Sequence, residues 1–216
     1  MWTFTLSPDR RVLAIGGQSQ PLQLWDTSTW RERPAVSDFD GGVGDLCFTP
    51  DSRQFIAVGY RGKHADMERR FLQLCDTASG EPVKNFTAQR VLYSRGLLVS
   101  PTGERALLHI SDDNVGTIQE WELATGKVMR KVGPVDQGAT PNPLAWSPDG
   151  RLVAVTAGYA GNTLIEVLDA KNWKVVAKLP AYSGKVNAAI FTSDSKFLVS
   201  GSDGRGIIWD LSKFLK

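Results

Sequence analysis

The side chains that could support catalysis or bind a metal are few, and they are scattered along the chain. Its 216 residues include only two histidines, His64 and His109. His64, Asp66 and Glu68 stand at alternate positions and could offer three metal ligands, but no second cluster accompanies them and cationic side chains surround them. His109 lies in an apolar stretch, and we interpret it as a hydrogen-bonded strand residue rather than a general base. We therefore predict no catalytic residue, no metal site and no cofactor.

The motifs of common nucleotide-dependent and hydrolytic enzymes are missing as well. The sequence contains no phosphate-binding loop of the Walker type, no Gly-rich dinucleotide fingerprint and no Gly-x-Ser-x-Gly elbow. The run Asp112-Asp113-Asn114 is typical of a turn, since no calcium-loop spacing follows it. The sequence thus predicts a protein that is not an enzyme.

Composition narrows the class of protein further. The chain is 42% hydrophobic with a formal net charge of +2, which allows a globular core but gives no strong footprint for nucleic acid. No apolar run is long enough to span a membrane and no secretory signal pattern is present, so we expect no membrane partner and a cytoplasmic location. Cys47 and Cys75 are expected to be buried reduced thiols, because a strand should separate them.

The elements that must position these side chains repeat five times. Each unit joins a turn of Ser-Pro-Asp type to an apolar strand that ends in Trp-Asp or a degenerate version of it. The turns begin at Ser7, Thr49, Ser100, Ser147 and Thr192, and the strands end at Asp26, Asp76, Glu122, Asp169 and Asp210. Successive ends are 50, 46, 47 and 41 residues apart. A repeat of this size cannot bury its own apolar faces, so the units must stack on one another.

Alternation of apolar and polar residues with a period of two predicts strands, as in Trp2 to Leu6 and Val175 to Leu179. Signals for helices are nearly absent. Each unit is expected to contain four strands. The sequence predicts an all-β single domain over residues 1–216, with five four-stranded units at approximately 1–40, 41–89, 90–135, 136–181 and 182–216.

These motifs resemble those of the WD-repeat (tryptophan-aspartate repeat) family of β-propellers, with repeats of the bacterial type, over essentially the whole chain. The resemblance implies a hydrogen-bonded network that locks each blade. In the last unit Trp209, Ser200 and Asp203 match three members of this network, and Tyr182 stands where the family has a His. Trp25 and Trp121 are expected to be core residues of their blades, whereas other residues replace Trp in the second and fourth units.

The resemblance also implies that function lies in loops rather than in the repeated motifs. In the family, the loops between the fourth and first strands and between the second and third strands gather on one face, and the Ser-Pro-Asp and Trp-Asp turns lie on the other. Two loops on the face opposite these turns are enlarged: residues 60–70 join the second and third strands of unit 2, and residues 133–143 join the fourth strand of unit 3 to the first strand of unit 4. The first is either a solvated surface loop or a surface that binds a protein partner. Its candidate binding residues are Tyr60, Arg61, Lys63, Arg69 and Arg70.

The function expected from the resemblance is a non-catalytic scaffold that binds a protein or peptide partner. Two alternatives are a sensor or regulatory propeller within a larger signalling protein and an enzyme that uses the central channel. Propellers of the family usually close their ring with strands from both ends of the chain, typically with seven blades. Here the fifth unit lacks a complete outer strand. The sequence therefore predicts an open or incomplete ring, which is expected to self-associate or to be completed by missing blades.

Overall fold

The computed structural model describes residues 2–17, 20–34, 39, 41–60, 70–86, 96–112, 115–132, 141–157, 163–182, 186–202 and 204–214. In this part of the chain the regular structure consists of β-strands and a short 3-10 helix, η3 (Ser212–Phe214). The strands form five antiparallel sheets, each from one continuous stretch of sequence. The sheets are the blades of a β-propeller, as the repeats predicted.

The strand order within each blade follows the order along the chain. Blade 1 contains β1 (Trp2–Leu6), β2 (Val12–Gly17), β3 (Gln20–Asp26) and β4 (Arg31–Glu32). Blade 2 contains β5 (Val43–Phe48), β6 (Gln54–Tyr60), β7 (Arg70–Asp76) and β8 (Pro82–Phe86). Blade 3 contains β9 (Leu97–Val99), β10 (Arg105–Asp112), β11 (Val115–Glu122) and β12 (Lys127–Val132). Blade 4 contains β13 (Pro143–Trp146), β14 (Leu152–Ala157), β15 (Thr163–Asp169) and β16 (Val175–Tyr182). Among the described residues, blade 5 has three strands, β17 (Val186–Phe191), β18 (Phe197–Ser202) and β19 (Arg205–Asp210).

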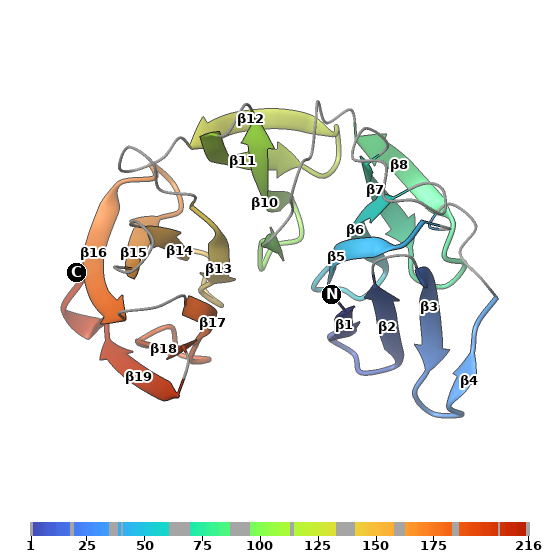
Figure 1. Ribbon diagram of the computed structural model, residues 1–216, viewed down its shortest axis with the longest axis horizontal. Helices are drawn as coiled ribbons and strands as arrows, with labels where there is room; N and C mark the ends of the chain where they lie inside the picture. Colours follow the sequence, from blue (N-terminus) through green and yellow to red (C-terminus); the bar gives the residue numbers. More distant parts are fainter. Residues whose placement is uncertain are drawn as a thin grey trace.

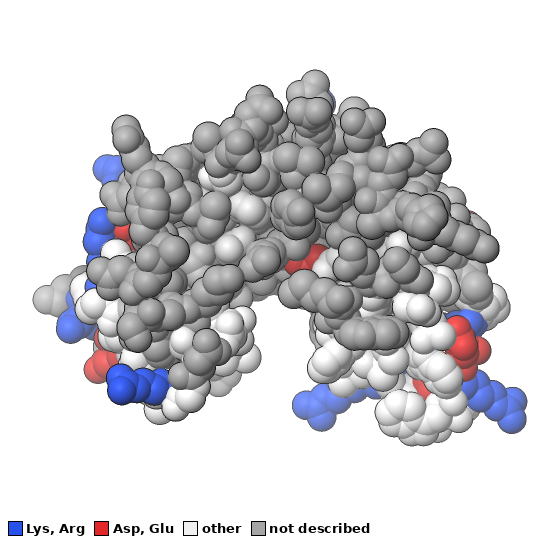
Figure 2. Space-filling view, in the orientation of Figure 1, with Lys and Arg blue, Asp and Glu red and all other residues white. Residues whose placement is uncertain are grey.

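The blades stand side by side in an arc around a common centre (Figure 1). The first strand of each blade lies towards this centre, and β1, β5, β9, β13 and β17 contact one another in succession. The fourth strands lie on the outside of the arc. Blades 1 and 5 do not close the ring, because an open gap separates them in the space-filling view (Figure 2). The molecule is thus an open propeller of five blades.

The Ser-Pro-Asp turns are built from a repeated set of hydrogen bonds. In the first turn the Ser7 hydroxyl donates to Asp9 Oδ1 at 2.6 Å and accepts the backbone N–H of Val12 at 3.0 Å. The residue after the Asp position has a positive φ in all five blades, and these residues are Arg10, Ser52, Gly103, Gly150 and Ser195. Asp9 accepts hydrogen bonds from the Ser7 hydroxyl and the Arg11 backbone N–H, and these bonds hold the pKa of Asp9 below its usual value. Thr49 and Thr192 do the same for Asp51 and Asp194.

The Asp of each Trp-Asp motif organises the next turn. Asp26 Oδ1 accepts the backbone N–H groups of Ser28 and Thr29 at 2.9 and 3.0 Å. Asp76 and Asp169 accept equivalent bonds from the backbone two and three residues further on. Blade 3 differs, because its motif ends in Glu122, whose side chain accepts the Thr125 hydroxyl instead. These motifs therefore shape turns, which is a structural role.

Apolar layers join neighbouring blades, and every blade faces its neighbours in the same way. The face with the Trp position of the third strand, here called the Trp face, packs on the preceding blade. Trp121 of blade 3 shares a layer with Ile56 and Phe86 of blade 2, and it meets the Phe86 ring edge-on at 5.7 Å between centroids. The opposite face, here called the outgoing face, packs on the following blade. The same relation holds for Cys75, Leu168 and Trp209, which pack on blades 1, 3 and 4.

This arrangement explains the two cysteines. Cys47 contacts the layer between blades 2 and 3, whereas Cys75 is buried in the layer between blades 1 and 2. Both are free thiols. Because their side chains lie on opposite faces of one sheet, the strand geometry keeps them apart. Burial raises the pKa of Cys47 to about 11, so this thiol stays protonated near neutral pH.

The layer between blades 3 and 4 also contains buried carboxylates. Glu120 Oε1 and Oε2 lie 2.8 Å from Arg105 Nη1 and 2.9 Å from Arg130 Nε. Glu166 Oε1 lies 3.0 Å from Lys178 Nζ, as an ion pair. The cations sit at the solvent edge of the layer while both glutamates are almost fully buried. Their pairing offsets the cost of removing the carboxylates from water.

Candidate functional site

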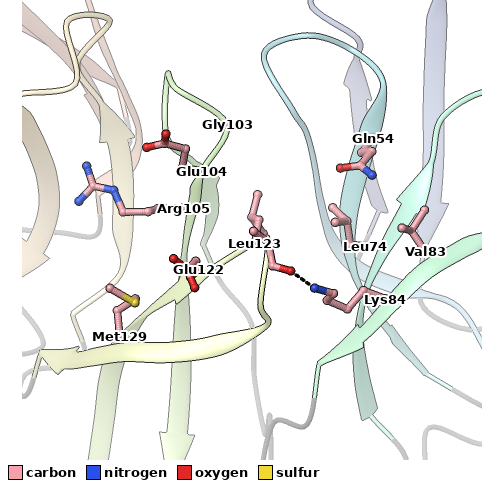
Figure 3. A pocket seen from close by; sticks show the side chains of 11 residues that line it. Gln54, Leu74, Val83, Lys84, Gly103, Glu104, Arg105, Glu122, Leu123 and Met129 are labelled. Atoms are coloured by element: carbon pink, nitrogen blue, oxygen red, sulfur yellow. Dashed lines mark hydrogen bonds between the residues drawn. The ribbon is translucent and has the colours of Figure 1, made fainter.

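A groove runs between blades 2 and 3 on the face that carries the Ser-Pro-Asp and Trp-Asp turns. It has a volume of about 720 Å³. Figure 3 shows its two walls, with β6, β7 and β8 on one side and the turns and outer strand of blade 3 on the other. The lining residues are Gln54, Leu74, Val83, Lys84, Gly103, Glu104, Arg105, Glu122, Leu123, Ala124 and Met129.

The turn of blade 3 lacks a hydrogen bond that joins the turns at two other junctions. Between blades 1 and 2 the backbone N–H of Asp9 donates to the Ser52 hydroxyl of the next turn at 3.0 Å. Between blades 4 and 5 the backbone N–H of Asp149 donates to the Ser195 hydroxyl at 3.3 Å. At the corresponding position blade 3 has Gly103, which carries no side chain to bridge the two turns. Gly103 lines the groove, and a Cβ at this position would lie 3.4 Å from Pro50 Cδ of blade 2.

The floor of the groove is apolar, and its rim holds two exposed apolar side chains. Leu74 and Leu123 are buried at the base. Val83 on β8 and Met129 on β12 are 54% and 56% exposed. Exposed Val and Met on neighbouring outer strands provide contact area that a bound segment can cover.

Two of the charged side chains that line the groove already have partners within the protein. Lys84 Nζ donates to the Ala124 carbonyl oxygen and thereby links blade 2 to blade 3 (Figure 3). Arg105 Nη1 donates to the buried Glu120 carboxylate at 2.8 Å. The carboxylates of Glu104 and Glu122 accept only hydroxyl groups of nearby threonines in the bonds that the structure defines. The charge that the groove offers to a ligand is therefore mainly negative.

The residues predicted to form the binding loop lie largely outside the described part of the chain. Arg61, Lys63 and Arg69 are among the residues that are not described. Tyr60 and Arg70 are described as backbone only, and they pair with each other at the ends of β6 and β7. The binding role of this loop stays a prediction.

The predicted blade network is described in part. The Trp209 indole Nε1 donates to the Ser200 hydroxyl at 2.9 Å within blade 5. Asp203 lies outside the described residues, and Tyr182 is described as backbone at the end of β16. Trp121 is buried in the layer between blades 2 and 3, whereas Trp25 is half-buried on the Trp face of blade 1. The role of Tyr182, Ser200, Asp203 and Trp209 as a locking network therefore stays a prediction.

The groove was not predicted from the sequence, although the sequence holds a signal for it. In the turn of blade 3, Thr102 stands where the other turns have Asp, and Gly103 follows it without a side chain.

Among the described residues, no group of three His, Cys, Asp or Glu side chains could hold a metal ion. The described part of the chain also contains no helix with the length and apolarity needed to cross a membrane. The predicted cytoplasmic location stays a prediction.

Comparison with known proteins agrees with the repeat pattern. The family described as WD domain, G-beta repeat, matches residues 173–210. The protein HIR1 of Eremothecium gossypii is 21% identical over 208 residues, which is 86% of this chain and 24% of HIR1. The WD repeat-containing protein WDS homolog of Arabidopsis thaliana is 26% identical over 211 residues, 95% of this chain and 37% of that protein. The chain belongs to the WD-repeat family of β-propellers. The bacterial type of its repeats stays a prediction.

This WD-repeat chain spans about a quarter to two fifths of the length of these curated relatives. A solved structure, Kuenenia stuttgartiensis hydrazine synthase, has a similar fold with a TM-score of 0.79. The match covers 97% of this chain and 71% of that chain at 16% sequence identity. At this identity the likeness concerns the propeller fold alone.

Proposed function

We propose that this WD-repeat propeller is a non-catalytic protein-interaction scaffold that binds a segment of a partner protein in the groove between blades 2 and 3. The observation that carries the proposal is the groove itself, with an apolar floor and the exposed Val83 and Met129 on its rim. The kind of function is supported by the WD-repeat relatives. Stacked blades hold the groove walls in fixed positions, so little entropy is lost when a ligand binds.

The chemistry of the groove selects the kind of segment that fits. Leu74, Leu123, Val83 and Met129 favour apolar side chains. The carboxylates of Glu104 and Glu122 favour Arg or Lys beside them, since both native cations of the groove are engaged elsewhere. We therefore propose a partner segment in which apolar residues are flanked by basic ones.

A peptide selection tests this proposal. A random peptide library displayed on phage is selected on the chain, and the dissociation constants of the selected peptides are measured by fluorescence polarisation. The groove variant carries Val83→Lys and Met129→Lys, two exposed positions where lysine leaves the core intact. The matched control carries Val128→Lys and Val175→Lys, which replace exposed apolar residues of β12 and β16 that do not line the groove.

We expect the selected peptides to be rich in apolar and basic residues and to bind the groove variant at least about tenfold more weakly, with unchanged binding to the control. The Glu104→Gln and Glu122→Gln changes should weaken binding and reduce its dependence on salt. Equal affinity for the groove variant and the control would contradict the proposal. So would selected peptides with no basic residues.

A further inference from the structure

The outer strands of blades 3 and 4 have a one-sided charge. Residues 123–132 and 170–182 form the outer strand of each blade and the turn before it, and they contain Lys and Arg but no Asp or Glu. The matching stretches of blades 1 and 2, residues 27–34 and 77–86, contain both signs of charge. Figure 2 shows Lys and Arg side chains along the outer edge of the arc beside β16. All the cations of these two stretches are exposed, and together they are here called the basic rim: Lys127, Arg130, Lys131, Lys171, Lys174 and Lys178.

Buried carboxylates hold two of these cations in place. Arg130 Nε lies 2.9 Å from Glu120 Oε2, and Lys178 Nζ lies 3.0 Å from Glu166 Oε1. The glutamate side chains are 1% and 0% exposed, whereas those of Arg130 and Lys178 are 42% and 56% exposed. The negative charge is thus inside the layer between blades 3 and 4, and the positive charge faces solvent. A ligand that binds these cations loses little side-chain entropy, because they are already positioned.

The turn that carries Lys171 is fixed as well. Arg130 Nη1 donates to the Lys171 carbonyl oxygen at 3.4 Å, which links β12 of blade 3 to this turn of blade 4. The Lys171 backbone N–H donates to Asp169 Oδ1 at 2.9 Å. Trp173 has a φ of 60° at a position that is glycine in blades 2 and 3, and its side chain packs in the layer between blades 3 and 4. The packing of Trp173 therefore anchors a turn whose backbone conformation is unfavourable for a large residue.

Strand β12 connects the rim with the groove. Met129 of β12 lines the groove between blades 2 and 3. Lys131 pairs with Gln119 and lies on the Trp face of β12, which is the side of blade 2. Arg130 pairs with Glu120 and lies on the outgoing face, which is the side of blade 4. A peptide that leaves the groove over Met129 therefore meets cations on both sides of β12.

We propose that the partner segment in the groove continues across β12 and that its next residues are acidic and bind the basic rim. This inference rests on the function proposed above, because the groove provides the first contact. Exposed ion pairs contribute little one by one, so the rim alone binds an acidic peptide weakly. A segment already held in the groove raises the local concentration of its acidic residues at the rim, and the same weak pairs then add to the affinity.

The rim favours a peptide over a nucleic acid. Val128 of β12 and Val175 of β16 are 39% and 36% exposed, and each stands next to a lysine of the rim in the sequence. They offer apolar contact area to side chains of a bound segment. Sites for single-stranded nucleic acid use exposed aromatic rings on which bases stack, and within the described rim the one aromatic side chain, Trp173, is half-buried. The partner segment is therefore expected to join apolar and basic residues to Glu or Asp on one side.

A tailed peptide tests this inference. A peptide from the selection on the groove is extended by four Glu residues at either its N-terminus or its C-terminus, and the matched peptides carry four Gln instead. Dissociation constants are measured by fluorescence polarisation at about 50 mM and about 300 mM NaCl, because salt screens contacts between exposed charges.

Two variants with equal net charge show where the tail binds. Each loses four positive charges, which lowers the formal net charge from +2 to −2. The rim variant changes cations that are not paired with the buried glutamates: Lys127→Gln, Lys131→Gln, Lys171→Gln and Lys174→Gln. The control variant changes exposed cations of blades 1, 2 and 5: Arg31→Gln, Arg53→Gln, Lys196→Gln and Arg205→Gln. All eight positions are exposed, so both variants should melt at the temperature of the wild type.

We expect the Glu tail, at one of the two ends, to strengthen binding to the wild type about five- to tenfold over the Gln tail at the lower salt concentration. The gain should shrink at the higher salt concentration. The rim variant should lose most of the gain and the control variant should keep it. Variants that carry only the two β12 changes, or only the changes at Lys171 and Lys174, should each lose part of it.

Three results would overturn the inference. The first is a Glu tail that gives no gain at either end. The second is an equal gain in the rim variant and the control, with the rim variant alone forming larger species by light scattering, because the lysines would then only prevent pairing between sheet edges. The third is a single-stranded oligonucleotide of about 20 nucleotides that binds the rim more tightly than the Glu-tailed peptide, because the rim would then be a nucleic-acid surface.

The Gln-tailed peptide separates a failure of this inference from a failure of the proposed function. If the groove is not the binding site, this peptide binds the Val83→Lys and Met129→Lys groove variant as tightly as the wild type, and both proposals fall. If only the rim inference is wrong, binding of the Gln-tailed peptide still depends on the groove, and the Glu tail adds nothing.

Discussion

The bond between Trp209 and Ser200 offers a test of what the repeated motif contributes to stability. Ser200 is buried, and its hydroxyl accepts the Trp209 indole N–H at 2.9 Å. Trp25 and Trp121 occupy the same position in blades 1 and 3, and their indole nitrogens have no hydrogen-bond partner among the described residues. The position of Ser200 is taken there by Ile15 and Leu108. Replacing Ser200 with Ala gives blade 5 the same lack of an acceptor.

The expected loss follows from the two consequences of the Ser200→Ala substitution. One hydrogen bond is lost, and the indole N–H that donated it is left without a partner, which together cost about 1–3 kcal/mol when the donor is buried. Trp209 is only half-buried, so water can reach part of its ring and the loss should lie near about 1–2 kcal/mol. For a chain of 216 residues each kcal/mol corresponds to about 2–4 °C in melting temperature.

Urea unfolding followed by circular dichroism and tryptophan fluorescence measures this loss. The Ser200→Thr substitution is the control, because it keeps a hydroxyl on a β-branched side chain that suits a strand. We expect Ser200→Thr to retain most of the stability that Ser200→Ala loses. If Ser200→Ala unfolds at the same urea concentration as the wild type, or if both substitutions lower the midpoint equally, the hydrogen bond is not the cause.

Three further predictions concern the turns and the contacts between blades. Hydrogen bonds lower the pKa of the turn aspartates, so these groups stabilise the fold above their unfolded pKa of about 3.9, and urea midpoints measured from pH 6 to pH 3 should fall as the pH drops through and below that value. The Gly96→Ala substitution places a Cβ 2.5 Å from the Pro143 carbonyl oxygen and should cost about 1–3 kcal/mol in urea unfolding, whereas Gly201→Ala, with nothing within 4 Å, should be tolerated. The Gly103→Ser substitution supplies the hydroxyl that Ser52 provides at the first junction, so stability should change by less than about 1 kcal/mol while the groove becomes smaller and its selected peptides bind more weakly by fluorescence polarisation.

The turn motifs were sufficient to predict the strands, because their signals are local. Ser147 and Asp149 bond to each other at 2.6 Å, and the bond from the Leu152 backbone N–H to Ser147 fixes where β14 begins. Such contacts span five residues or fewer, so the residue types at fixed offsets define them. The open arc was also predicted, from the count of repeats.

The groove and the buried carboxylates could not be predicted in the same way, because they depend on contacts between strands and blades. Glu120 stands in a strand that alternation alone would read as half exposed, yet it is buried because Arg105 and Arg130 reach it from β10 and β12. The groove is lined by residues of two blades, with Gly103 and Met129 of blade 3 lying opposite Leu74 and Val83 of blade 2. These relations require the register of neighbouring strands and the order in which faces meet, and neither is encoded at a fixed spacing.

A stack of similar blades uses one type of interface repeatedly, and this has a consequence for where the protein can bind. Because each Trp face packs on an outgoing face, a substitution within a buried row disturbs two blades at once. Cys75 and Phe55 are such positions, since they lie in the layer between blades 1 and 2. Residues of the turns lie outside these rows, so a different residue at a turn position such as Gly103 alters one junction without disturbing the layers. The turn face can therefore vary while the stack is maintained.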